Sequence, residues 1–287
     1  MEILEFGKEN KDKIILIHGF ETPYQIWEKY IEHYKNIFHI IVPILQGHNP
    51  NEKEDFVSFE QSAKDIEDYY ISRYGQNVFA IYGMSMGGVL TAQLWENKNL
   101  NIDKVILESS PLISYNRIMT AMMTKQYLML THKTQARDKK IIAQAVNSII
   151  PEDKLEEFLE MMDNMSDTTI INYIRQIGRY KLPSNIDTPN TEVHYYYGTK
   201  INELLAKKTA KYIRTNYSTS NVKCFKGKGH CEDSLLNPSV MIAELDKVLD
   251  IRKRDNTSLS YLPNSNVVKA SGSQTINERK GINEIER

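Results

Sequence analysis

A serine flanked by glycine two residues away on each side, Gly83-x-Ser85-x-Gly87, separates an apolar run from a stretch compatible with a helix. Residues 78–82 before it are typical of a buried strand, and residues 86–97 after it carry apolar side chains at helical spacing. A serine in such a sharp turn has strained backbone with its hydroxyl held outward, and flanking glycines avoid collisions with the adjacent strand and helix. The motif therefore predicts a strand–turn–helix unit with Ser85 as candidate nucleophile.

Short apolar runs alternate with amphipathic stretches along the first 110 residues. The predicted strands are 14–17, 38–45, 78–82 and 104–107, and the predicted helices are 22–34, 58–74 and 86–97. This alternation is typical of parallel strands joined by crossover helices, in which ligands bind beyond the carboxyl ends of the strands. His18, Ser85 and Glu108 each lie at such an end.

The pattern changes in the second half of the chain. From 111 to 189 helical periodicity dominates, and seven of the eleven methionines lie there. Further strands are predicted at 192–197 and 222–225, and further helices at 203–216 and 238–249. Residues 252–287 are polar without sustained periodicity and predict a flexible tail. We therefore expect a core of residues 1–110 and 190–251, interrupted by a helical insertion at 111–189.

The charge balance disfavours several classes of partner. The formal net charge is −1, from 36 basic and 37 acidic residues, so no long-range field would recruit nucleic acid or an anionic membrane. No signal peptide or apolar stretch long enough for a transmembrane helix is recognisable. Cys224 and Cys231 are too few for a disulfide framework or a four-cysteine zinc site. We expect a cytoplasmic protein, without cofactor or metal, that acts on a small molecule.

Three segments taken together resemble the α/β-hydrolase superfamily. They are a strand-like run ending in His-Gly at 18–19, the Gly-x-Ser-x-Gly motif around Ser85, and a late Gly-His at 229–230. The resemblance extends from the first residue to about residue 250. It implies the α/β-hydrolase fold, a mostly parallel sheet flanked by helices, with residues 111–189 as an inserted helical cap.

The resemblance also implies roles for individual residues. Ser85 would be the nucleophile and His230 the general base, since imidazole can accept and return a proton near neutral pH. The backbone N–H groups of Phe20 and Met86 would form an oxyanion hole. Serine rather than aspartate at position 85 argues against the dehalogenases and epoxide hydrolases of the superfamily. We expect cleavage of a small or acyl-chain carboxylic ester through an acyl-enzyme.

The acid that would orient His230 is open at this level. In much of the superfamily it follows the seventh strand in a Gly-x-x-Asp pattern, but here the third residue after Gly198 is Ile201, and Glu203 comes two residues late. Some superfamily members instead carry the acid at the strand end where Glu108 lies. A carboxylate just beyond an apolar strand is expected to be partly buried and to need a partner. We therefore favour Glu108 and keep Glu203 as the second candidate.

A different class of function fits the same motifs. A hydrolase-fold protein can hold a small ligand under its cap and turn it over slowly or not at all, and superfamily members of that kind can retain the triad. The methionines of the cap could line a pocket for an acyl chain or only pack helix on helix. The physiological substrate, the type of bond cleaved and the oligomeric state cannot be deduced from these residues.

Overall fold

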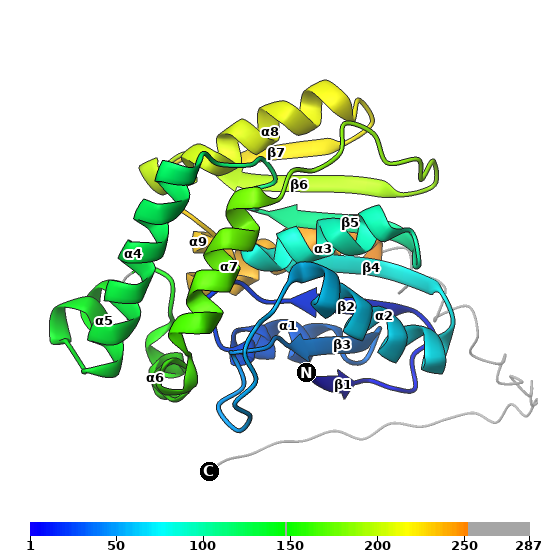
Figure 1. The fold of residues 1–287 in the computed structure, drawn as a ribbon. Helices are drawn as coiled ribbons and strands as arrows, with labels where there is room; N and C mark the ends of the chain where they lie inside the picture. Colours follow the sequence, from blue (N-terminus) through cyan, green and yellow to red (C-terminus); the bar gives the residue numbers. More distant parts are fainter. Residues whose placement is uncertain (147, 252–287) are drawn as a thin grey trace, which may run out of the picture. The chain divides into compact units, whose positions relative to one another are not determined.

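A seven-stranded sheet lies at the centre of the described chain, residues 1–146 and 148–251 of a computed structural model (Figure 1). The strands are β1 (Glu2–Phe6), β2 (Lys13–Ile17), β3 (His39–Ile44), β4 (Asn77–Met84), β5 (Asn101–Glu108), β6 (Glu192–Gly198) and β7 (Asn221–Phe225). Their order is β1-β3-β2-β4-β5-β6-β7, and neighbouring strands are parallel except for β1 with β3. The predicted α/β class with a mostly parallel sheet is confirmed.

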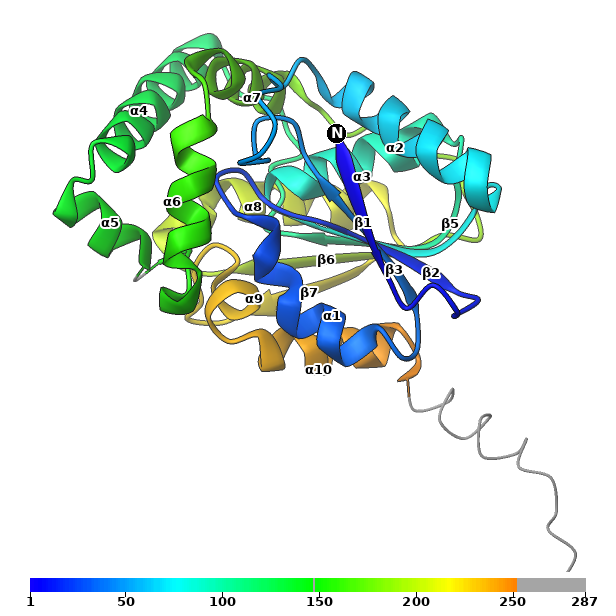
Figure 2. The same cartoon turned by 90° about the horizontal axis from the view of Figure 1, so that it is seen from below.

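Helices cover both faces of this sheet. On one face lie α2 (Phe59–Tyr74), α3 (Met86–Asn97) and α8 (Leu204–Asn216), and on the other lie α1 (Glu28–Tyr34) and α10 (Pro238–Val248) (Figure 2). Shorter elements are the 3₁₀ turns η1 (Tyr24–Trp27) and η3 (Ile201–Glu203), and α9 (Glu232–Leu236). Because crossover helices connect parallel strands, the carboxyl ends of β2 and β4 to β7 meet at one edge of the sheet.

The chain between β5 and β6 is helical where the structure describes it. It forms α4 (Arg117–Gln135), α5 (Lys139–Val146), η2 (Glu152–Lys154), α6 (Leu155–Asn164) and α7 (Asp167–Arg179), which lie beyond the carboxyl ends of the strands (Figure 1). Met161, Met162 and Met165 are buried in a core of these helices, whereas Met119 and Met122 are exposed. The buried methionines thus pack helix against helix.

Polar side chains cap several of the predicted helices. Ser58 accepts a hydrogen bond from the Gln61 N–H at the start of α2, and Ser166 does the same for Thr169 at the start of α7. The stretch 22–34, predicted as one helix, divides into η1 and α1. Two elements, β1 and α9, have no counterpart in the prediction; β1 is an edge strand, only partly buried, with a weak pattern. The predicted tail, 252–287, lies outside the described residues.

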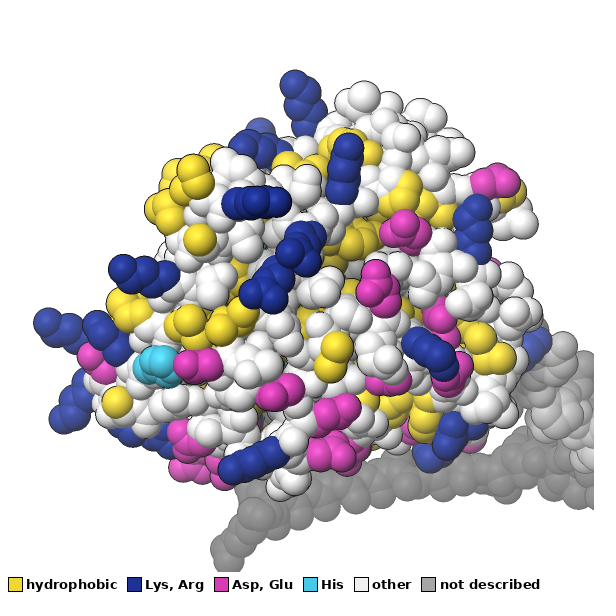
Figure 3. Space-filling model, viewed as in Figure 1, with side chains coloured by type: hydrophobic (Ala, Val, Ile, Leu, Met, Phe, Trp, Pro, Cys, Tyr) yellow, Lys and Arg dark blue, Asp and Glu magenta, His cyan; other side chains and the backbone are white. Residues whose placement is uncertain are grey.

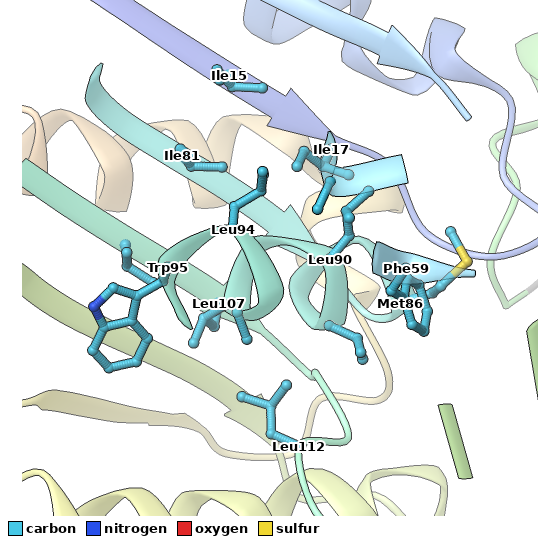
Figure 4. Close-up of a cluster of buried hydrophobic side chains, with 14 of the residues drawn as sticks. Ile15, Ile17, Phe59, Ile81, Met86, Leu90, Leu94, Trp95, Leu107 and Leu112 are labelled. Carbon is cyan, nitrogen blue, oxygen red and sulfur yellow. The ribbon is translucent and has the colours of Figure 1, made fainter. Parts of the chain in front are cut away.

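The helix after Ser85 is anchored in the core of the protein. Leu90 and Leu94 of α3 are fully buried against Ile17, Ile81 and other apolar side chains of the sheet (Figure 4). Removing such a buried leucine side chain costs about 2–5 kcal/mol, since both transfer free energy and packing are lost. This packing holds the first turn of α3, and with it Ser85, in a fixed position.

Candidate active site

Ser85 occupies a sharp turn between β4 and α3. Its backbone has φ 53° and ψ −116°, a conformation that costs a non-glycine residue about 1–3 kcal/mol. A Cβ added to Gly83 would lie 2.2 Å from Thr91 Oγ1, and one added to Gly87 would lie 2.3 Å from the Ile17 carbonyl oxygen. Both flanking positions therefore require glycine, and the strand–turn–helix unit forms as the sequence predicted.

A chain of hydrogen bonds leads from Ser85 through His230 to Glu203. The Ser85 Oγ lies 2.7 Å from His230 Nε2, and His230 Nδ1 lies 2.7 Å from Glu203 Oε1. A carboxylate only accepts, so Nδ1 carries a hydrogen and Nε2 is free to accept from the serine hydroxyl. His230 reaches this position from the loop after β7, which turns at Gly227 with φ 77°. The structure thus brings together two residues chosen from motifs, Ser85 and His230, with the second candidate acid.

Glu203 is held by further donors on its other oxygen. It is fully buried, and its Oε2 accepts from the Gly198 N–H at 2.7 Å and from Ser109 Oγ at 3.0 Å. The 3₁₀ turn η3 folds the chain back toward the end of β6, which places the carboxylate beside Gly198. These bonds fix the plane in which the carboxylate meets the His230 imidazole. Ser109 was not identified from sequence; its only signal is its position next to Glu108 at a strand end.

The preference for Glu108 is corrected by the structure. Its carboxylate accepts hydrogen bonds from the Tyr82 hydroxyl and from Ser234 Oγ of α9, whereas the His230 Nδ1 contacts Glu203. Burial raises the pKa of Glu108 to about 7, although these two hydroxyls oppose the shift. Its backbone still serves the site, because its carbonyl accepts from the Ser85 N–H at 2.7 Å. Glu108 is a buried carboxylate with its own partners, as expected, but these partners are hydroxyls.

The loop after β2 lies beside Ser85. A Cβ added to Gly19 would be 3.5 Å from the Ser85 Cβ, so Phe20 and Met86, the residues proposed to donate backbone N–H groups, flank the serine. The ring of Phe20 packs against Tyr127 of α4, with ring centroids 5.3 Å apart. This contact ties the loop to the helical insertion.

Two buried histidines brace that loop. His18 Nε2 accepts from the Leu45 N–H at 3.2 Å, and His48 Nε2 accepts from the Glu21 N–H at 3.1 Å. Burial lowers the pKa of His18 to about 4 and lowers that of His48 well below its usual range, so both are neutral at pH 7. As acceptors of backbone hydrogen bonds they have a structural role, in line with the bracing role inferred for His18.

The described residues were also searched for other kinds of site. Across residues 1–146 and 148–251, no group of three or more His, Cys, Asp or Glu side chains is arranged to hold a metal ion. None of the described helices is long and apolar enough to cross a membrane.

Comparison with known proteins places this geometry in a wider context. The family model described as alpha/beta hydrolase fold matches residues 13–269. No curated protein matches the sequence. Similar solved structures include a carboxylesterase structure from the thaumarchaeon Nitrososphaera gargenis, with 14% identity, a TM-score of 0.68, and coverage of 88% of this chain and 95% of that one.

Two further structures have a comparable likeness. A malate-bound thermophilic esterase from Thermogutta terrifontis has 14% identity and a TM-score of 0.68, with 87% of this chain and 92% of that chain covered. An esterase from Exiguobacterium antarcticum has 17% identity and a TM-score of 0.63, with 90% and 94% covered. At these identities the likeness establishes the fold.

Proposed function

This chain belongs to the alpha/beta hydrolase fold family, and on that premise we propose that it is a serine hydrolase that cleaves a small or acyl-chain carboxylic ester. The observation that carries the proposal is the Ser85–His230–Glu203 hydrogen-bond chain, with both links at 2.7 Å. Such a chain supplies what a serine needs to act as a nucleophile, namely a base within reach and a carboxylate that orients the base.

The proposed reaction has two halves. Ser85 Oγ attacks the ester carbonyl carbon while its proton passes to His230 Nε2, and the carbonyl oxygen becomes an oxyanion. Collapse of this tetrahedral intermediate breaks the bond to the alcohol, which leaves with the proton from His230. Water then attacks the acyl-enzyme with the same proton transfers, releasing the acid and restoring Ser85. Glu203 stabilises the imidazolium that forms in each half.

The oxyanion would be stabilised by the backbone N–H groups of Phe20 and Met86. Met86 is the first residue of α3, where the positive end of the helix dipole favours negative charge. Phe20 lies in the loop that packs against the Ser85 turn. Loss of one such donor typically costs about 2.7–4 kcal/mol in the transition state. Because both donors are main chain, the shape of the two turns matters more than side-chain identity.

Other observations support the same reading. Esterases occur among the solved structures that resemble this chain. The same machinery can also act on thioesters, amides or carbon–carbon bonds, and the fold does not decide among them. We name an ester because an uncharged alcohol is a good leaving group for a serine–histidine pair and the site needs no further group to cleave it.

The kinetics of three variants test the proposal. Ser85→Ala and His230→Ala should each lower kcat for 4-nitrophenyl esters by about 10⁶-fold, and the double variant should be little worse, because residues of a triad act as a unit. Circular dichroism and Tm should show that all three remain folded. Losses that add in the double variant, or turnover unaffected by Ser85→Ala, would contradict the proposed roles.

A further inference from the structure

A cavity of about 850 Å³ lies between α4 and α7 in the helical insertion. The two helices approach most closely at one end, where a Cβ added to Gly178 would lie 2.6 Å from Thr120 Oγ1. Leu128 and Ile171 contribute apolar side chains to the lining. The volume is within the range of small-molecule sites, which are typically about 300–1,000 Å³.

Four cationic side chains line this cavity, two from each helix. Arg117 and Lys125 are eight residues apart on α4, and Arg175 and Arg179 are four apart on α7, so each pair lies on one helix face. Figure 3 shows Lys and Arg side chains gathered over this part of the surface. Cations at this spacing repel one another by a few tenths of a kcal/mol unless an anion lies between them.

No carboxylate among the described residues balances this charge. The cavity lining of residues 1–146 and 148–251 contains no Asp or Glu, and none of the four cations forms an ion pair there. Elsewhere in the insertion, cations are paired: Arg137 binds Asp163. The cavity therefore combines an apolar lining with unbalanced positive charge. Arginine in particular presents a planar fork of donors that matches a carboxylate or phosphate group.

The inner wall of the cavity separates it from the loop beside Ser85. Tyr115 lines the cavity and is held by its N–H, which donates to the Gly178 carbonyl at 2.8 Å. Burial, with a smaller contribution from nearby Tyr127, raises the pKa of the Tyr115 hydroxyl. Tyr127 in turn contacts the ring of Phe20. The cavity is thus one layer of aromatic side chains away from the proposed oxyanion hole.

From this arrangement we propose that the cavity between α4 and α7 binds the carboxylate or phosphate group of an anionic substrate. The inference rests on the proposed hydrolase function and narrows it. The anionic end of the substrate would lie between the arginines of α7 and the cations of α4, and its carbon chain would lie against the apolar lining. An uncharged ester of the same length would lack the first set of contacts.

Matched esters test this proposal by turnover. Mono(4-nitrophenyl) adipate and 4-nitrophenyl hexanoate share a six-carbon acyl chain, and only the first carries a carboxylate. The double variant Arg175→Gln/Arg179→Gln should raise KM for the adipate ester about tenfold or more, since charged hydrogen bonds are lost, and leave KM for the hexanoate ester unchanged. 4-Nitrophenyl 5-phosphonopentanoate distinguishes a phosphate preference from a carboxylate preference.

A control variant removes the same charge elsewhere. Lys208→Gln/Lys211→Gln on α8 also neutralises two exposed cations, outside the cavity lining, and should leave KM for all three esters unchanged. A rise in KM for the adipate ester in both double variants would reflect net charge alone and would overturn the assignment of the cavity. Equal KM changes for the charged and neutral esters in the α7 variant would overturn it as well.

Binding without turnover separates this proposal from the hydrolase proposal. Calorimetric titration of adipate, and separately of 5-phosphonopentanoate, into Ser85→Ala protein should show saturable binding that weakens about tenfold in Ser85→Ala/Arg175→Gln/Arg179→Gln. If this binding is present but no ester is cleaved by the parent protein, the hydrolase function fails and the anion site stands. If esters are cleaved but neither anion binds, the anion site fails and the hydrolase function stands.

Discussion

Two buried glutamates near neighbouring strand ends differ in what surrounds them. Glu203 follows β6 and accepts from His230, Ser109 and the Gly198 N–H. Glu108 ends β5 and accepts from the hydroxyls of Tyr82 and Ser234. Burial is nearly the same, with 0% and 4% of the two residues exposed. Burial therefore does not identify the acid of a triad; the partner of each carboxylate does.

The difference follows from which way each side chain points. Side chains alternate along a strand, and Glu108 points to the sheet face that Tyr82 shares and that α9 covers with Ser234. Glu203 lies in a turn beyond its strand, so its direction is set by η3 rather than by the alternation. It can therefore reach over the edge of the sheet to the loop that carries His230.

The largest difference between the two glutamates should be in catalysis. Glu203→Gln should lower kcat by about 10⁴-fold, because an amide no longer favours the hydrogen on His230 Nδ1. Glu108→Gln should change kcat by less than about tenfold, because its partners lie outside the Ser85–His230 chain. Steady-state kinetics of both variants with one 4-nitrophenyl ester measure this. A larger loss for Glu108→Gln would reverse the assignment.

A second difference should appear in the pH dependence of stability. The pKa of Glu108 is raised from the usual 4.5 to about 7, so the native state holds this proton more tightly than the unfolded chain does. Its contribution is full below about pH 4.5 and declines by about 3 kcal/mol as the pH rises to about 7. Glu108→Gln should lack this decline.

Urea unfolding of parent and Glu108→Gln protein at pH 5, 6, 7 and 8 measures that difference. Glu21, whose pKa burial also raises to about 7, contributes a similar slope to both proteins and cancels in the comparison. Stability profiles that remain parallel over this range would show that the Glu108 pKa is not raised.

The smallest effect concerns the hydroxyl groups around the two glutamates. Tyr82→Phe removes a donor to Glu108 and should lower the free energy of unfolding by about 1–3 kcal/mol with kcat little changed. Tyr115→Phe is the matched control, because the Tyr115 hydroxyl is buried with no hydrogen-bond partner among the described residues. Its removal should be neutral or stabilising. Equal destabilisation by both changes would indicate lost packing rather than a lost hydrogen bond.

Much of the fold could be predicted because its signals are local. The alternation of apolar runs and amphipathic stretches reflects strands buried between two layers of helices, and Gly83 and Gly87 mark close approaches that only glycine allows. Ser85 and His230 could be chosen for the same reason, since each lies in a glycine-containing turn at a strand end.

The acid could not be chosen because its position depends on tertiary contacts. Nothing local distinguishes Glu203 from an ordinary acidic residue at a helix start, and the fold around Gly198 and Ser109 is what turns it toward His230. Glu108 had the stronger local signal, an acid at the end of an apolar strand, but Tyr82 and Ser234 come from elsewhere in the chain. The cavity between α4 and α7 is likewise visible only once both helices are placed.

The central claim is that Ser85 is an activated nucleophile, and intact-protein mass after exposure to a fluorophosphonate probe tests it most directly. The account predicts a single adduct on the parent protein, no adduct on Ser85→Ala, and much slower labelling of Glu203→Gln than of Glu108→Gln. A folded parent protein that forms no adduct, or an adduct that persists in Ser85→Ala, would contradict it.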